Sequence, residues 1–286
     1  MYDNGKLVLP EFQRDFKWPL EKSETLFDSI FKDLFIGSLI ISKPKFDLAC
    51  KGLDLRKRGS TGRKPKEKDY TSDEFERNGI YTLLDGQQRV TSIYRALRGP
   101  DEIYLIFQEI STLLSPDFYD YTNNEVKASS EDFIDGFDSK KPGEKLLFIC
   151  MKDLYKGKDW REDKFYAEFI APLISKMSLD QNEIDILKDY IFKLKSDFNA
   201  SILKQKTLIS VQLLDMSIEK FCLYFERSNS QGLNLSFSDI VTAKVYTKFK
   251  LQREKKDAVE KYKYFRENLL ESTLRYINYL AFKYLE

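Results

Sequence analysis

The stretch from Tyr81 to Leu97, YTLLDGQQRVTSIYRAL, carries the strongest local signal in the chain. Its first residues are apolar and β-like. From Val90 onward apolar side chains recur at helical spacing as far as Gly99-Pro100. The stretch therefore predicts a strand, a tight turn at Asp85-Gly86 and a helix. Asp is a good N-cap, and Gly permits a tight turn and a close approach of the backbone.

This turn has the chemistry of an anion site. The free N–H groups of a first helical turn attract anions, and the helix dipole strengthens the attraction. Arg89 would add a permanently charged fork for phosphate oxygens, while Gln87 and Gln88 could hydrogen-bond a nucleotide or orient a water molecule. The structural alternative is a capped turn with solvent-facing amides, and the residues alone favour neither interpretation.

Two further polar clusters flank the turn in sequence. Upstream, PEFQRDFKWP (residues 10–19) offers Arg14, which could face Arg89 across a phosphate, and Phe16 or Trp18, which could wall a base. The alternative is that these aromatics belong to the core. Downstream, FERSNSQGLNLSFSDIVTAK (residues 225–244) has a glycine-centred turn before a helix and on its own favours a helix-turn-helix connection.

The order of elements around these motifs predicts an α+β fold. Short strands are expected at residues 6–9, 38–42, 80–84, 102–107, 146–151 and 207–213, with helices at 19–34 and within 160–198. We expect residues 1–110 to form a small α/β nucleotide-binding subdomain. Residues 111–286 are expected to be mainly helical, with one returning strand near 207–213.

The segment 51–68 differs in composition from its surroundings. It holds eight basic residues against two acidic ones, a local net charge of +6, with interspersed Gly and Pro. This pattern predicts a loop or mobile flap outside the core. Arg56, Lys57 and Arg58 would then contact DNA phosphates, and a solvated loop is the alternative.

Composition excludes several classes of protein. The 286 residues include 47 basic and 46 acidic side chains, so no global field favours nucleic acid. The absence of histidine excludes Ser-His-Asp and Cys-His nucleophiles, zincins and an HNH nuclease centre within this chain. The three cysteines lack any CxxC spacing, and no metal site is predicted. No apolar run approaches a membrane span, so a cytoplasmic, prokaryotic protein is expected.

The strings LPEFQRDFKWP, IGSLIIS, LLDGQQRVTSIYRAL and FERSNSQGLNLSFSDIVTAK together resemble the GmrSD N-terminal domain family, known by its DGQQR motif, over roughly residues 5–250. The strand-turn-helix also resembles the ParB/sulfiredoxin-like fold. The resemblance implies a small mixed sheet with helices, a mainly helical second half, and nucleotide binding or NTP hydrolysis with substrate-borne Mg²⁺. By resemblance the catalytic residues are Asp85, Gln88 and Arg89, and the nucleotide-binding residues are Gln13, Arg14, Gly86, Gln87, Arg227 and Asn229.

Family members such as type IV restriction enzymes usually carry a histidine-dependent HNH nuclease domain, which this chain cannot provide. We therefore expect a piece of a longer protein, with the nuclease in another domain or partner. The expected function is an NTP-binding, NTP-hydrolysing regulatory domain of a modification-dependent restriction or phage-defence system. A non-enzymatic sensor of DNA modification and a self-contained nuclease are the alternatives. Expected partners are a nucleoside triphosphate and modified phage DNA, and self-association is left open.

Overall fold

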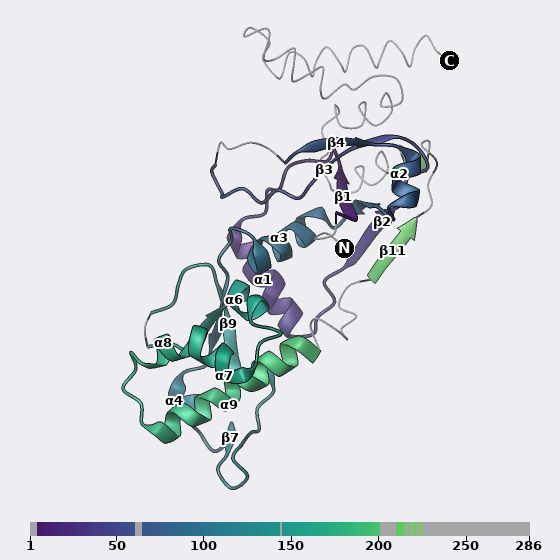
Figure 1. The fold of residues 1–286 in the computed structure, drawn as a ribbon. Coiled ribbons are helices and arrows are strands. Elements are labelled where there is room, and N and C mark those ends of the chain that lie inside the picture. The colour runs from purple at the N-terminus through teal and green to yellow at the C-terminus, as the bar shows by residue number, and fades with distance from the viewer. Residues whose placement is uncertain are drawn as a thin grey trace, which may run out of the picture.

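The computed structural model describes residues 5–60, 65–143, 145–200 and 210–214, together with Ser217, Lys220, Phe221 and Tyr224. The expected α+β fold is confirmed. Six strands form one mixed sheet in the order β11-β2-β5-β1-β3-β4 (Figure 1). Their bounds are β1 (Leu7–Pro10), β2 (Ser38–Ser42), β3 (Leu48–Lys51), β4 (Glu67–Tyr70), β5 (Tyr81–Asp85) and β11 (Ser210–Leu214).

The centre of this sheet is β5, the strand that leads into the DGQQR turn. It runs parallel to β1 and antiparallel to β2, and Leu83 and Thr82 within it are completely buried. Strand β11 pairs in parallel with β2 along all five of its residues. This strand overlaps the one expected near 207–213, of which residues 207–209 lie outside the described part of the chain.

A second, smaller sheet follows in the order β10-β6-β9, with all its pairs antiparallel. Short elements surround it in the region 108–145, where the sequence gave no firm prediction, and helices follow it. The strands are β6 (Tyr104–Phe107), β9 (Ile134–Asp138), β10 (Phe148–Cys150) and the hairpin β7 (Tyr119–Asp120) with β8 (Glu125–Val126). The helices are α4 (Ile110–Leu113), α5 (Ser130–Phe133), α6 (Met151–Lys156), α7 (Glu162–Phe165), the π-helix η1 (Tyr166–Ile170), α8 (Ala171–Ile174) and α9 (Gln181–Asp197).

Helix α3 (Gln87–Arg98) connects the cores of the two sheets. Its Val90 and Tyr94, one turn apart, pack against the core of the six-stranded sheet. Ala96 on another face belongs to the large core built on the second sheet and on α1 (Leu20–Phe31). In Figure 1 both α1 and α3 lie between the six-stranded sheet and the elements around β9. A helix with two apolar faces is thereby held from both sides, which fixes the position of its N-terminus.

The prediction of a loop or mobile flap over the whole of 51–68 was wrong at its ends. Lys51 closes β3 and pairs with Glu67 of β4, so the segment is the connection of a β-hairpin that also packs α2 (Ser72–Arg77) beside it. Leu53 is buried, because its side chain joins the core of the six-stranded sheet. Residues 61–64 lie outside the described part. No helix among the described residues has the length and apolar character needed to cross a membrane.

Candidate functional site

The turn between β5 and α3 is built on a left-handed glycine. Gly86 occupies the N-cap position of α3 with φ of 91°. A Cβ atom there would lie 2.1 Å from the Cδ2 atom of Leu39, so neither the conformation nor the space admits another residue. The expectation that Asp85 caps the helix was wrong. Asp85 is still paired with Ile40 of β2, and no side chain caps α3 in this structure.

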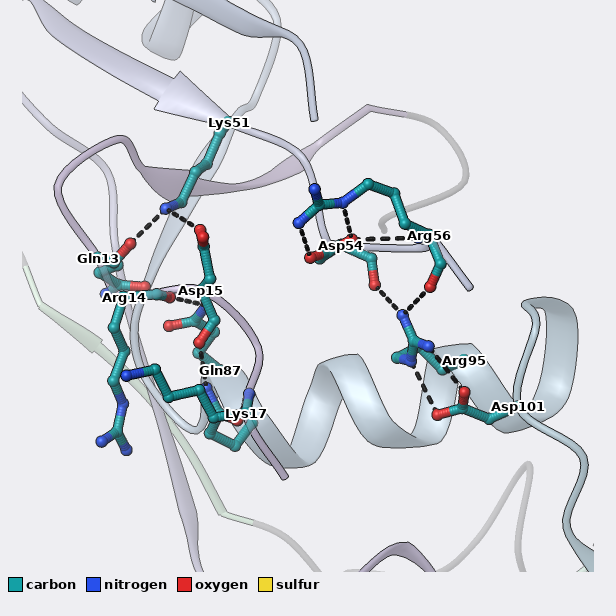
Figure 2. Close-up of polar contacts among 11 residues, drawn as sticks. Gln13, Arg14, Asp15, Lys17, Lys51, Asp54, Arg56, Gln87, Arg95 and Asp101 are labelled. Carbon is teal, nitrogen blue, oxygen red and sulfur yellow. Dashed lines mark hydrogen bonds and ion pairs between the residues drawn. The ribbon is translucent and has the colours of Figure 1, made fainter. Parts of the chain in front are cut away.

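The two glutamines that follow bind the main chain of the upstream motif. Gln87 donates its Nε2 hydrogen to the carbonyl oxygen of Arg14 at 2.7 Å (Figure 2). Gln88 accepts hydrogen bonds at Oε1 from the backbone N–H groups of Lys17 at 2.9 Å and Trp18 at 3.1 Å. Its Nε2 donates to the carbonyl oxygen of Asp15. The first and second sequence motifs therefore meet, and the segment 14–18 lies against the first turn of α3.

Gln13 and Arg14 are placed differently from each other, although they are neighbours. The Gln13 side chain is 5% exposed and donates to the carbonyl oxygens of Leu83 at 2.8 Å and Leu84 at 3.1 Å. Its Oε1 atom is buried and has no hydrogen-bond partner among the described residues. The guanidinium of Arg14 is half-buried and makes no hydrogen bond or ion pair within that same part of the chain.

Arg89 was expected to present a free fork to phosphate, and here it is occupied by protein. Its side chain is 18% exposed. Nη1 donates to the carbonyl oxygen of Ile36 and Nη2 to that of Ser38, both at 2.7 Å, and Nη2 lies 3.5 Å from a carboxylate oxygen of Asp85. Gly37 between the two carbonyls has φ of 99°, and a Cβ there would lie 2.2 Å from Nη1. Arg89 thus holds the connection between α1 and β2.

The third motif is not tested, because Arg227 and Asn229 lie outside the described residues.

The basic segment is organised by a buried ion pair on α3. Arg95 is 2% exposed and forms a bidentate pair with Asp101 at 2.7 and 2.8 Å. Its Nη1 also donates to the carbonyl oxygens of Asp54 at 2.7 Å and Arg56 at 2.8 Å (Figure 2). Arg58 pairs with the same Asp101 at 2.8 Å. The loop after β3 is therefore fastened to α3 through charges and carbonyls that sequence analysis did not identify.

These contacts enclose a pocket with a volume of about 230 Å³. The Cζ atoms of Arg58 and Arg95 lie 5.2 and 5.0 Å from the ring centroid of Phe16. The lining residues are Phe16, Lys17, Asp54, Arg56, Lys57, Arg58, Gly59, Ser60 and Arg95. Phe16 thus contributes to this pocket, and the expected DNA contacts Arg56, Lys57 and Arg58 all line it.

Comparison with known proteins places the chain among restriction-related domains. It belongs to the family of the GmrSD restriction endonuclease N-terminal domain, whose model matches residues 1–246. The chain is also similar to the uncharacterized protein MJ0686 of Methanocaldococcus jannaschii, with 26% identity over 284 residues. That alignment covers 90% of this chain and 42% of the relative, so the chain spans less than half of that protein's length.

We predict that Gly37→Ala destabilises the protein more than Gly79→Ala. Both glycines have positive φ, 99° and 59°, but a Cβ meets nothing within 4 Å at Gly79. Left-handed strain alone costs about 1–2 kcal/mol, and at Gly37 displacement of the Arg89 guanidinium adds to it. Urea unfolding of the two variants measures the difference. Equal losses would show that the contact between Gly37 and Arg89 carries no stability.

We predict that Asp101→Asn costs about 3–5 kcal/mol at neutral pH, because it leaves the buried Arg95 charge unpaired. Burial alone would raise the pKa of Asp101, but hydrogen bonds from Arg95 and Arg58 outweigh it and lower the pKa. This contribution is therefore present above the unfolded-state value of about 3.9 and lost as pH falls through the folded-state pKa.

The measurement is the free energy of unfolding from urea curves at neutral pH and at about pH 3, below the unfolded-state pKa. The difference between wild type and Asp101→Asn should shrink on acidification. Asp73→Asn is the control, because Asp73 is 74% exposed in its ion pair with Arg77 and should cost less than about 1 kcal/mol. A difference for Asp101→Asn that stays constant with pH would contradict the prediction.

Proposed function

We propose that this chain is a nucleotide-binding, NTP-hydrolysing regulatory domain of a modification-dependent restriction or phage-defence system. Membership of the GmrSD N-terminal family supports the restriction-related part. The nucleotide part is supported by one contact above all. The hydrogen bond from Gln87 to the carbonyl of Arg14 brings the unpaired Arg14 guanidinium to the N-terminal turn of α3.

In the proposed mode, phosphate oxygens bind at this turn. Backbone N–H groups at the start of a helix and a guanidinium together favour a multiply charged anion. Gln13 adds a buried Oε1 that has no partner among the described residues and can accept a hydrogen bond from the ligand. The side chain of Asp85 is 41% exposed, which leaves it accessible for orienting the attacking water.

Magnesium would arrive with the triphosphate. In the described part of the chain there is no group of three carboxylate or thiol side chains that could hold a metal ion. Magnesium commonly binds through one or two carboxylates plus substrate phosphates, and Asp85 fits that limited role. When bound, the ion would neutralise charge developing on the phosphates.

The remaining residues of the motifs have supporting roles in this proposal. Gln88 uses both amide atoms on the backbone of the segment 15–18 and would hold that segment in position. Arg89 reaches the phosphates after exchanging at least one of its two carbonyl acceptors for a phosphate oxygen. Arg227 and Asn229, which lie outside the described residues, would complete the nucleotide contacts.

A non-enzymatic module that senses modified DNA is the second candidate, and the basic pocket favours it. Arg56 and Arg58 are held by the carboxylates of Asp54 and Asp101, whereas Lys57 is exposed and has no partner in the described structure. In either case the nuclease would lie in another domain or a partner protein.

The test is release of phosphate from each NTP by the purified chain with Mg²⁺, with and without modified DNA. Arg14→Ala should weaken nucleotide binding by about 1.5–3 kcal/mol, roughly ten- to a hundredfold, because it removes a charged hydrogen-bond donor. Arg77→Ala is the control, since Arg77 is 79% exposed and lies on α2. Calorimetry that gives the same affinity for Arg14→Ala and wild type would refute the assignment.

We also predict that this chain alone does not cut DNA. Nucleophile activation needs a base or a metal-bound water, and the sequence has no histidine to supply an HNH centre. The measurement is plasmid nicking with Mg²⁺ or Mn²⁺, each NTP, and unmodified or glucosylated hydroxymethylcytosine DNA. Nicking that persists through purification and disappears when a carboxylate is mutated would contradict the prediction.

A further inference from the structure

We propose that the pocket beside Phe16 is a phosphate-binding site separate from the DGQQR turn. Five cationic side chains line it: Lys17, Arg56, Lys57, Arg58 and Arg95. Two carboxylates oppose them: Asp54 in the lining, and Asp101, which pairs with Arg58 and Arg95. Even with both carboxylates counted, three positive charges remain without a protein counter-charge in this group. Such an excess of positive charge in a concave site attracts a multiply charged anion.

The pocket is preorganised, which separates it from a solvated basic loop. Arg95 holds the carbonyl oxygens of Asp54 and Arg56 from within α3. Arg58 is fixed by Asp101 and by a hydrogen bond to the carbonyl of Trp18 at 2.5 Å. Because these groups are already ordered, little conformational entropy is lost when a ligand binds.

The cations that remain for a ligand are Lys17 and Lys57. Both side chains are exposed, both line the pocket, and neither ammonium group has a hydrogen-bond or ion-pair partner among the described residues. They come from the upstream motif and from the loop after β3, so they approach the pocket from different parts of the chain. An ammonium group binds phosphate as a point charge and tolerates several orientations of the oxygens.

The pocket adjoins the candidate nucleotide site without sharing its side chains. Gln88 of the DGQQR turn holds the backbone N–H groups of Lys17 and Trp18, while the Lys17 side chain lines the pocket. At about 230 Å³ the pocket is larger than a single phosphate group and leaves space for part of an attached sugar. The phosphate therefore belongs to a nucleotide unit, either free or within a nucleic-acid backbone.

This inference deepens the DNA-binding part of the proposed function and does not depend on NTP hydrolysis. The experiment measures fluorescence anisotropy of labelled single-stranded and duplex oligonucleotides over a range of salt concentrations, with no NTP present. Unlabelled ATP and pyrophosphate are tested by calorimetry. The variant is Lys17→Ala with Lys57→Ala, and the matched control is Lys140→Ala with Lys152→Ala, two exposed lysines outside the pocket.

Losing two phosphate contacts should reduce the salt slope of log affinity by about 1.8 for duplex DNA or about 1.4 for a single strand. That result, absent from the control, identifies a nucleic-acid phosphate as the ligand. Loss of pyrophosphate and ATP binding without any change in oligonucleotide binding identifies a free nucleotide. The proposal is overturned if the pocket variant matches wild type for every probe, if the control variant loses as much, or if wild type binds none of them. Failure of NTP hydrolysis would leave these readouts unchanged.

Discussion

Hydrogen bonds from the first turn of α3 to main-chain atoms hold the rest of the site in place. Gln87 and Gln88 bind the segment 14–18, and Arg89 binds the carbonyls on either side of Gly37. Each such bond adds about 1 kcal/mol net, but a buried donor or acceptor left without its partner costs about 1–3 kcal/mol. The arrangement is therefore lost together rather than bond by bond, and the position of Arg14, the α1–β2 connection and one wall of the basic pocket all depend on it.

A second anchor lies two turns further along the same helix. The pair between Arg95 and Asp101 fixes the loop after β3 in the way that the glutamines fix the upstream motif. One helix, packed between two cores, thus positions both the candidate nucleotide turn and the basic pocket. The two sites differ in what they offer. The turn presents backbone donors and Arg14, whereas the pocket presents side-chain cations arranged around Phe16.

Sequence predicted the elements better than it predicted what their polar side chains contact. The strand, turn and helix around Gly86 follow from an apolar run, a glycine and helical spacing, and the structure contains all three. The meeting of Arg14 with the DGQQR turn was expected from family resemblance. The Arg89 contacts were not, because their acceptors are carbonyl groups, which every residue carries and no pattern marks. Arg95 was missed for the same reason, and its partner Asp101 lies beyond a Gly-Pro that ends the helix.

Recognition of main-chain atoms by α3 separates two kinds of sequence change. The side chains at Asp15 and Lys17 can be replaced without removing an acceptor or donor that Gln88 uses, except that proline at position 17 or 18 lacks the N–H group. A deletion within the segment is different, since it shifts the following backbone by about 3.3–3.6 Å, more than a hydrogen bond can absorb. Relatives built on this frame are therefore free to alter the side chains that face a ligand while the length of the segment stays constant. New ligand preferences can arise here by substitution alone.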